Sequence, residues 1–90
     1  MSGGKNSLER IRVLVRLKEG VLDVQGKAIE SSLLEHGVKA LRDVRVGKVV
    51  EFTIDSSQFS SRESKDAEVR RLCDELFTNP VIESYSLEAV

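Results

Sequence analysis

Apolar and polar residues alternate in the first patterned segment of the chain. After Glu9, the odd positions up to Lys18 are apolar and the even positions carry a positive charge, with Leu14 as the exception. A period of two that is rich in β-branched residues predicts a β-strand with one buried face. Two later runs, Val49–Ile54 and Val81–Glu88, predict further strands.

Two segments have the spacing of amphipathic helices. Residues 24–36 carry an apolar stripe that follows Asp23, a good N-cap residue, and precedes Gly37, which tolerates the left-handed conformation of a helix C-terminus. A second helix is expected to begin at a Ser60–Glu63 capping box and to end at Asn79-Pro80. We expect both helices to pack their apolar stripes on a sheet.

A fourth short apolar run, Leu41–Val46, is joined to the next strand by Gly47-Lys48, which predicts a β-hairpin. The predicted order is β-α-β-β-α-β, an α+β two-layer sandwich of the ferredoxin-like type with an antiparallel sheet and two helices on one face. In this order the basic first strand faces Glu51 and Asp55, and opposite charges across an antiparallel pair help to fix register. Residues 9–90 are expected to form one domain, after a flexible leader of residues 1–8.

The composition narrows the class of protein. The chain has 90 residues, with 14 Lys+Arg against 15 Asp+Glu and a formal net charge of −1, which argues against a nucleic-acid-binding or polybasic membrane surface. One cysteine excludes an intramolecular disulfide framework, and no segment approaches the ~20 apolar residues that span a bilayer. With a free thiol and no export signal, the cytoplasm is the expected compartment. So small a domain has a small core, and association with a partner is expected.

Residues that carry catalytic chemistry are sparse. Cys73 lies on the apolar stripe of the second helix without a His or Asn partner, which favours a buried structural role. His36 stands at the end of the first helix, where its ring can bond the last carbonyls. A lone His and a lone Cys on different helices make a poor zinc site. We therefore expect no catalytic, cofactor-binding or metal-binding residues in this chain.

The face of the sheet without helices is the clearest candidate for a contact surface. Four apolar residues are predicted there: Leu14, Leu41, Val49 and Ile82. Together they favour a contact between the sheet and a partner, although single exposed apolar residues are ordinary and that reading stays open. Arg45 and Lys48, near the predicted hairpin tip, suit either an acidic partner or the protection of an edge strand.

Three segments carry a family resemblance: Lys18–Glu30, Val44–Lys48 and Asn79–Tyr85. In this order and spacing they resemble the PurS subunit of phosphoribosylformylglycinamidine synthase, and with the strand–helix pattern they cover nearly the whole chain. The resemblance implies a non-catalytic adaptor in de novo purine (IMP) biosynthesis. Such a subunit bridges a PurQ-type glutaminase and a PurL-type ATP-dependent synthetase, and assists ammonia transfer for conversion of formylglycinamide ribonucleotide to its amidine. The resemblance also implies a homodimer, with tetramers in isolation left open, and places ATP and magnesium on the large partner.

The matching segments divide into two groups of residues. Candidates for subunit contact are Gln25, Lys27, Arg45, Lys48 and Asn79, beside the apolar residues of the sheet. Turn or cap roles are expected for Gly20, Asp23, Gly26, Gly37, Gly47 and Pro80. Gly26 lies inside a helix, where glycine is unfavourable, so we expect another backbone to approach closely there.

Two other functions share the predicted order of elements. An ACT-like regulatory module that binds small molecules remains the alternative, although such modules are normally fused to an enzyme. An RNA-binding sheet needs aromatic side chains on its open face, whereas Phe52 and Tyr85 share the parity of the buried residues.

Overall fold

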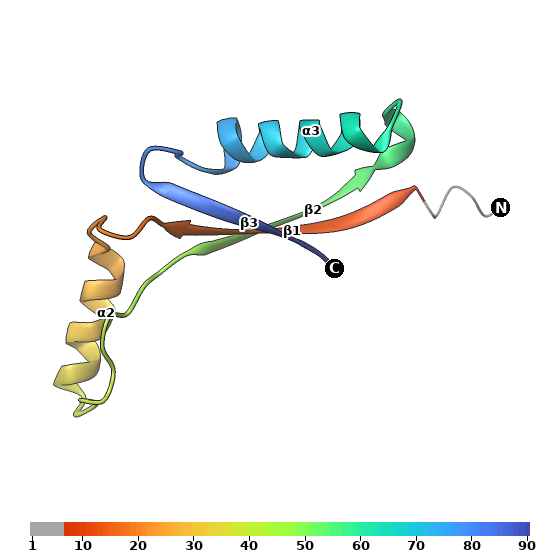
Figure 1. Cartoon of the computed structure of the whole chain (residues 1–90). Coiled ribbons are helices and arrows are strands. Elements are labelled where there is room, and N and C mark those ends of the chain that lie inside the picture. Colours follow the sequence, from red (N-terminus) through yellow and green to blue (C-terminus); the bar gives the residue numbers. More distant parts are fainter. Residues whose placement is uncertain (1–6) are drawn as a thin grey trace.

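A computed structural model describes residues 7–90 of the chain (Figure 1). The helices and strands in chain order are β1 (Leu8–Leu17), α2 (Val24–Glu35), β2 (Lys48–Asp55), α3 (Arg62–Leu72) and β3 (Glu83–Ala89). A 3₁₀ turn, Ser56–Gln58, follows β2, and a π-helical turn, Cys73–Phe77, continues α3. The predicted α+β class is confirmed.

These three strands form one antiparallel sheet in the order β2-β1-β3, with β1 at the centre. The register places Arg12 opposite Glu51, and the Arg12 Nε donates to the Glu51 carboxylate at 2.7 Å. Arg12 and then Arg10 hold the pKa of the Glu51 carboxyl below its usual value. The predicted pairing of these two strands through opposite charges is therefore confirmed.

The core lies between the sheet and α3, which crosses one face of it (Figure 1). Val13 and Val15 of β1 are buried there against Val69 and Cys73, as the alternation along β1 requires. Phe52 and Phe77 pack around this centre with ring centroids 5.7 Å apart, and other half-buried side chains complete it.

The predicted hairpin is wrong, because residues 41–47 form no strand. Asp43 has a φ of 55°, in the left-handed region, which interrupts an extended run. The Val44 N–H donates to the Glu30 carboxylate at 3.2 Å and the Val46 N–H donates to the Asp23 carboxylate at 2.6 Å. These carboxylates take backbone donors that a hairpin ladder would use. The ferredoxin-like order is therefore corrected to β-α-β-α-β within residues 7–90.

α2 does not pack beside α3, so the prediction of two helices on one face is also wrong. Figure 1 shows α2 beyond the end of the sheet, with the chain returning along it toward β2. The radius of gyration is 17.9 Å, against about 12 Å for a compact domain of this length. We call α2 and its flanking segments, residues 18–47, the arm. Helical periodicity shows which side of α2 is apolar but does not say what covers it.

Element boundaries differ from the predictions by one or two residues. The capping box of α3 is formed by Ser61 and Ser64, one residue later than predicted. β3 begins at Glu83 because the Asn79 carbonyl accepts hydrogen bonds from two following amides in a turn. β1 begins at Leu8, the last residue of the predicted leader, and the leader's residues 1–6 lie outside the described part of the chain. In the described residues, none of the helices has the length and apolar character needed to cross a membrane.

Candidate interaction site

A buried carboxylate joins the two segments at the base of the arm. Asp23 is 4% exposed; its Oδ1 accepts from the Gly26 N–H at 2.7 Å as the predicted N-cap of α2. Its Oδ2 accepts from the Val46 N–H at 2.6 Å. The bond from Val46, followed by the bond from Gly26, holds the pKa of the Asp23 carboxyl below its usual value. We call residues 38–47, which lead from α2 back to β2, the return segment. Asp23 therefore remains ionised at neutral pH and holds the return segment against the start of α2.

Arg45 strengthens the same junction. Its guanidinium donates to the Val21 carbonyl at 3.2 Å and to the Lys18 carbonyl at 3.3 Å, and its Nε lies 3.9 Å from the Asp23 carboxylate. The guanidinium thus bonds this chain's own backbone, a structural role that the sequence did not predict. Lys48, at the start of β2, is exposed, and its contact role stays a prediction.

Two glycines allow this junction to close. A Cβ on Gly26 would overlap the Val44 carbonyl oxygen, and a Cβ on Gly47 would lie 2.5 Å from the Val15 carbonyl oxygen. Both contacts are with backbone, which cannot move aside as a flexible side chain can. The close approach of another backbone that we predicted at Gly26 is confirmed.

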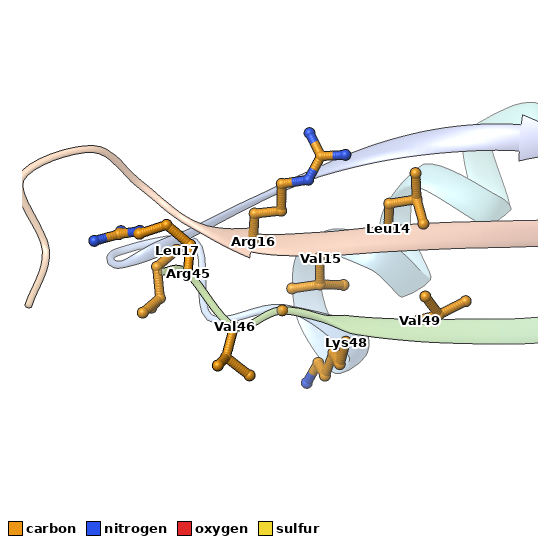
Figure 2. A pocket seen from close by; sticks show the side chains of 9 residues that line it. Leu14, Val15, Arg16, Leu17, Arg45, Val46, Lys48 and Val49 are labelled. Atoms are coloured by element: carbon orange, nitrogen blue, oxygen red, sulfur yellow. The ribbon is translucent and has the colours of Figure 1, made fainter. Parts of the chain in front are cut away.

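A hollow of about 300 Å³ lies on the sheet beside the base of the arm. Its apolar lining comes from Leu14, Val15, Leu17, Val46 and Val49. Figure 2 shows that Arg16, Arg45 and Lys48, at its rim, point away from one another. The three cations do not converge on a common point, so the hollow is an apolar surface with a basic rim rather than an anion pocket.

The arm carries much of the exposed apolar surface. Large apolar side chains at least 39% exposed on it are Leu22, Val24, Ile29, Leu34, Val38 and Leu41. Gln25 and Lys27 are also exposed on α2. A single chain therefore leaves the predicted apolar stripe of this helix uncovered, which is unusual for a protein that acts alone.

The open face of the sheet brings together only part of the predicted apolar patch. Leu14 and Val49 lie directly opposite each other in the register. Leu41 lies on the arm in a segment that forms no strand, so the patch loses this residue, whereas Ile82 lies in the turn before β3 and its carbonyl accepts from the Lys18 N–H at 2.8 Å. Beside this pair, Arg12 forms ion pairs with Glu51 and Glu88, which fix the polar part of the face.

Asn79 and Pro80 form the turn between α3 and β3. The Asn79 N–H donates to the Glu83 carboxylate at 2.7 Å, and its side-chain oxygen accepts from the Val81 N–H at 3.2 Å. The Pro80 carbonyl accepts from Lys18 Nζ at 2.7 Å. Asn79 thus has a local structural role beside its predicted role in subunit contact.

Cys73 and His36, the two residues considered for catalysis or metal binding, both have structural roles. Cys73 is 0% exposed, and burial raises the pKa of its thiol, which keeps the sulfur protonated and unreactive. The His36 Nδ1 lies 2.8 Å from the Ser32 carbonyl oxygen, at the end of α2. Across residues 7–90, no group of three or more His, Cys, Asp or Glu side chains is placed to hold a metal ion.

Sequence reasoning missed the buried Lys65. Charged residues of a helix usually lie on its solvated face, but Lys65 is 4% exposed and its Nζ donates to the Glu9 carboxylate at 2.7 Å. Its spacing of four from Val69 on the apolar stripe was the available signal. Thr78 is buried as well, and its hydroxyl donates to the Cys73 carbonyl at 2.6 Å, closing the π-helical turn.

The fold and these surfaces define a small α+β association module. A family model described as PurS, phosphoribosylformylglycinamidine (FGAM) synthase, matches residues 10–90. The PurS subunit of phosphoribosylformylglycinamidine synthase from Bacillus subtilis (strain 168) is 39% identical over 79 residues, which cover 88% of this chain and 89% of that protein. The chain belongs to the PurS family, subunits of phosphoribosylformylglycinamidine synthase, a glutamine-dependent ligase of purine biosynthesis.

Solved structures agree with this assignment. A crystal structure of B. subtilis PurS aligns with a TM-score of 0.79 and 38% identity, covering 91% of this chain and 98% of that one. A chain in the structure of PurLQS from Thermotoga maritima aligns with a TM-score of 0.77 and 26% identity, covering 92% of this chain and 98% of that one. The three-stranded sheet with an extended arm is therefore placed among folds of the same family.

Proposed function

We propose that this chain is the non-catalytic adaptor of its synthase, bridging a PurQ-type glutaminase and a PurL-type synthetase. The similarity to a chain of the T. maritima PurLQS structure over 92% of this sequence carries the proposal. The buried, protonated thiol of Cys73 and the structural contact of His36 support a role without acid, base or nucleophile. ATP and magnesium, which activate the amide of formylglycinamide ribonucleotide, belong in this proposal to the large partner.

Ammonia transfer is assigned to the surfaces between subunits. Free ammonia escapes or is protonated in water, so its path needs walls that exclude solvent. The hollow of Figure 2 is open on one side and has apolar walls. A partner subunit lying over such a surface would close it. In this proposal the chain supplies one wall of the path and fixes the spacing of the two catalytic subunits.

The homodimer is proposed to form by exchange of arms. A second hollow, of about 330 Å³, is lined by Val15, Leu17, Leu22 and Val46 on the α3 side of the sheet. The sequence pattern assigns the apolar stripe of a helix to this side, whereas the chain's own α2 borders the hollow only through its first turn and extends beyond the end of the sheet (Figure 1). A second copy is the fitting occupant because its arm carries this helix.

Reconstitution with separately purified glutaminase and synthetase subunits tests the adaptor role. We expect co-elution of three subunits in the presence of ATP and glutamine. Leaving out this chain should abolish amidine formation from glutamine and preserve formation from added ammonium salt, since only transfer between sites is lost. If glutamine-dependent turnover is unchanged without this chain, the adaptor role is wrong. A free amino acid that raises the melting temperature, without any complex, would favour the ACT-like alternative.

Sedimentation equilibrium tests arm exchange. Ile29→Asp places a charge on the exposed apolar stripe of α2 and should weaken the dimer about tenfold or more. Ser31→Asp, an exposed position on the same helix, is the matched control and should leave the dimer intact. Equal effects of the two variants would remove α2 from the dimer interface.

A further inference from the structure

At the base of the arm, the side chains of Asp23 and Arg45 form hydrogen bonds that are possible only for one direction of the arm. Asp23 accepts backbone N–H groups from both segments, Gly26 at 2.7 Å and Val46 at 2.6 Å. Arg45 joins the same two segments from the other side: it belongs to the return segment, and its guanidinium donates to the Lys18 and Val21 carbonyls of the first segment. We call these two residues the Asp23–Arg45 clamp.

These contacts suit only the extended arm. In β1 and β2, Val15 lies opposite Lys48, so on the same antiparallel register residues 47, 46 and 45 continue beside residues 16, 17 and 18. In a hairpin that reverses at Gly47-Lys48, residues 45 and 46 would lie on the outer side of β2. They would then be about two strand spacings, or ~10 Å, from β1. Neither the Val46 bond to Asp23 nor the Arg45 bonds to the first segment would survive.

We infer that the Asp23–Arg45 clamp selects the extended arm over a folded-back arm that would cover the chain's own sheet. The same sequence pattern that predicts a hairpin and two helices on one face describes the folded-back state. The clamp adds charge-assisted hydrogen bonds to the extended state alone, so it shifts the balance between the two. Its effect on assembly rests on the arm exchange proposed above, whereas its effect on the arm's direction within one chain does not.

The substitution Asp23→Asn separates the clamp from the helix cap. The asparagine side chain would keep one oxygen for the Gly26 N–H, and asparagine caps helices as well as aspartate does. Its amide NH₂ cannot accept from the Val46 N–H. Asp23→Asn therefore removes the bond between the two segments and leaves α2 capped. Arg45→Gln removes the other half of the clamp.

Arg42→Gln is the matched control. Arg42 lies on the same return segment and the substitution removes the same charge, but within residues 7–90 its guanidinium bonds only the nearby Lys39 and Leu41 carbonyls. Arg45→Lys, which keeps the charge but loses the planar fork, should give an intermediate effect. Far-UV circular dichroism on all variants shows whether α2 and α3 remain folded.

An intrachain distance reports the arm's direction. Spin labels at Glu35→Cys and Ala67→Cys, both exposed, lie on α2 and α3, while the buried Cys73 is protected from the label. Doubly labelled chains are diluted into excess unlabelled chains of the same variant, so that only distances within one chain are measured by pulsed electron paramagnetic resonance. Sedimentation equilibrium is run on the same samples.

Wild type and Arg42→Gln should show one long distance. Asp23→Asn and Arg45→Gln should gain a shorter one, with the ratio of folded-back to extended arms raised about tenfold or more, and with a weaker dimer. Distance distributions identical to that of Arg42→Gln would overturn the clamp. If the clamp variants shift the distance while wild type is monomeric at every concentration, the clamp stands and arm exchange is wrong.

Discussion

Replacing Gly26 by alanine is the sharpest test of how the arm is built, because two known effects oppose each other. Alanine inside a helix is favoured over glycine by about 1 kcal/mol. Its Cβ would overlap the Val44 carbonyl oxygen, and displacing packed backbone costs about 1–3 kcal/mol. Moving Val44 also breaks its N–H bond to Glu30, worth about 1 kcal/mol. The structure therefore predicts that Gly26→Ala lowers the free energy of unfolding by about 1–3 kcal/mol.

Thermal unfolding followed by far-UV circular dichroism measures this change. For 90 residues, 1 kcal/mol corresponds to about 5 °C, so the melting temperature should fall by about 5–15 °C. Ser31→Ala, at an exposed position of the same helix, should raise it slightly, since it gains helix propensity without a collision. A melting temperature of Gly26→Ala equal to or above that of wild type would refute the close packing of α2 against the return segment.

Three further predictions concern buried charge, pH and the open face. Glu9→Gln removes the closest carboxylate from the buried Lys65 and should lower the free energy of unfolding by about 1–3 kcal/mol. Lys65→Met removes the buried charge itself and should change this free energy by less than about 1 kcal/mol. Urea unfolding in which Lys65→Met is the more destabilising of the two would contradict this. The folded-state pKa of Asp23 is lowered, so its ionised form stabilises the fold fully above about pH 4, and this contribution is lost as pH falls through the lowered pKa. The difference in urea stability between wild type and Asp23→Asn should therefore shrink below about pH 4, and a constant difference down to about pH 2 would contradict the assignment. Val49→Asp, at an exposed position facing Leu14, should weaken the affinity for the two catalytic subunits about tenfold without lowering the melting temperature. Co-elution with these subunits measures the change, and unchanged co-elution would remove the open face from the interface.

Local features of the fold could be predicted from the sequence because their causes lie close together in the chain. The N-cap at Asp23 and the bounds of α2 follow from residues within a few positions. The pairing of Arg12 with Glu51 follows from alternation, which sets the face of each strand. The close approach at Gly26 was predicted from the cost of glycine in a helix, although its partner, Val44, was not.

The direction of the arm could not be predicted in this way. The short apolar run Leu41–Val46 is compatible with a strand, but the carboxylates of Asp23 and Glu30 accept backbone N–H groups of this segment. The role of Arg45 depends on the same long-range arrangement, so charge alone suggested a surface contact. The burial of Lys65 was missed for a related reason, since its partner Glu9 is 56 positions away.

The exposed apolar side chains of the arm make the stability of this protein depend on the concentration of whatever covers them. Within residues 7–90, only four apolar side chains are buried in the core of one chain, while Leu22, Val24 and Ile29 are at least 45% exposed. If a second copy or a partner covers the arm, each tenfold fall in its free concentration removes about 1.4 kcal/mol of stabilisation for as long as that concentration exceeds the dissociation constant. Copies made in excess of their partners would then unfold and be degraded first, which would match the abundance of this subunit to that of the subunits it joins.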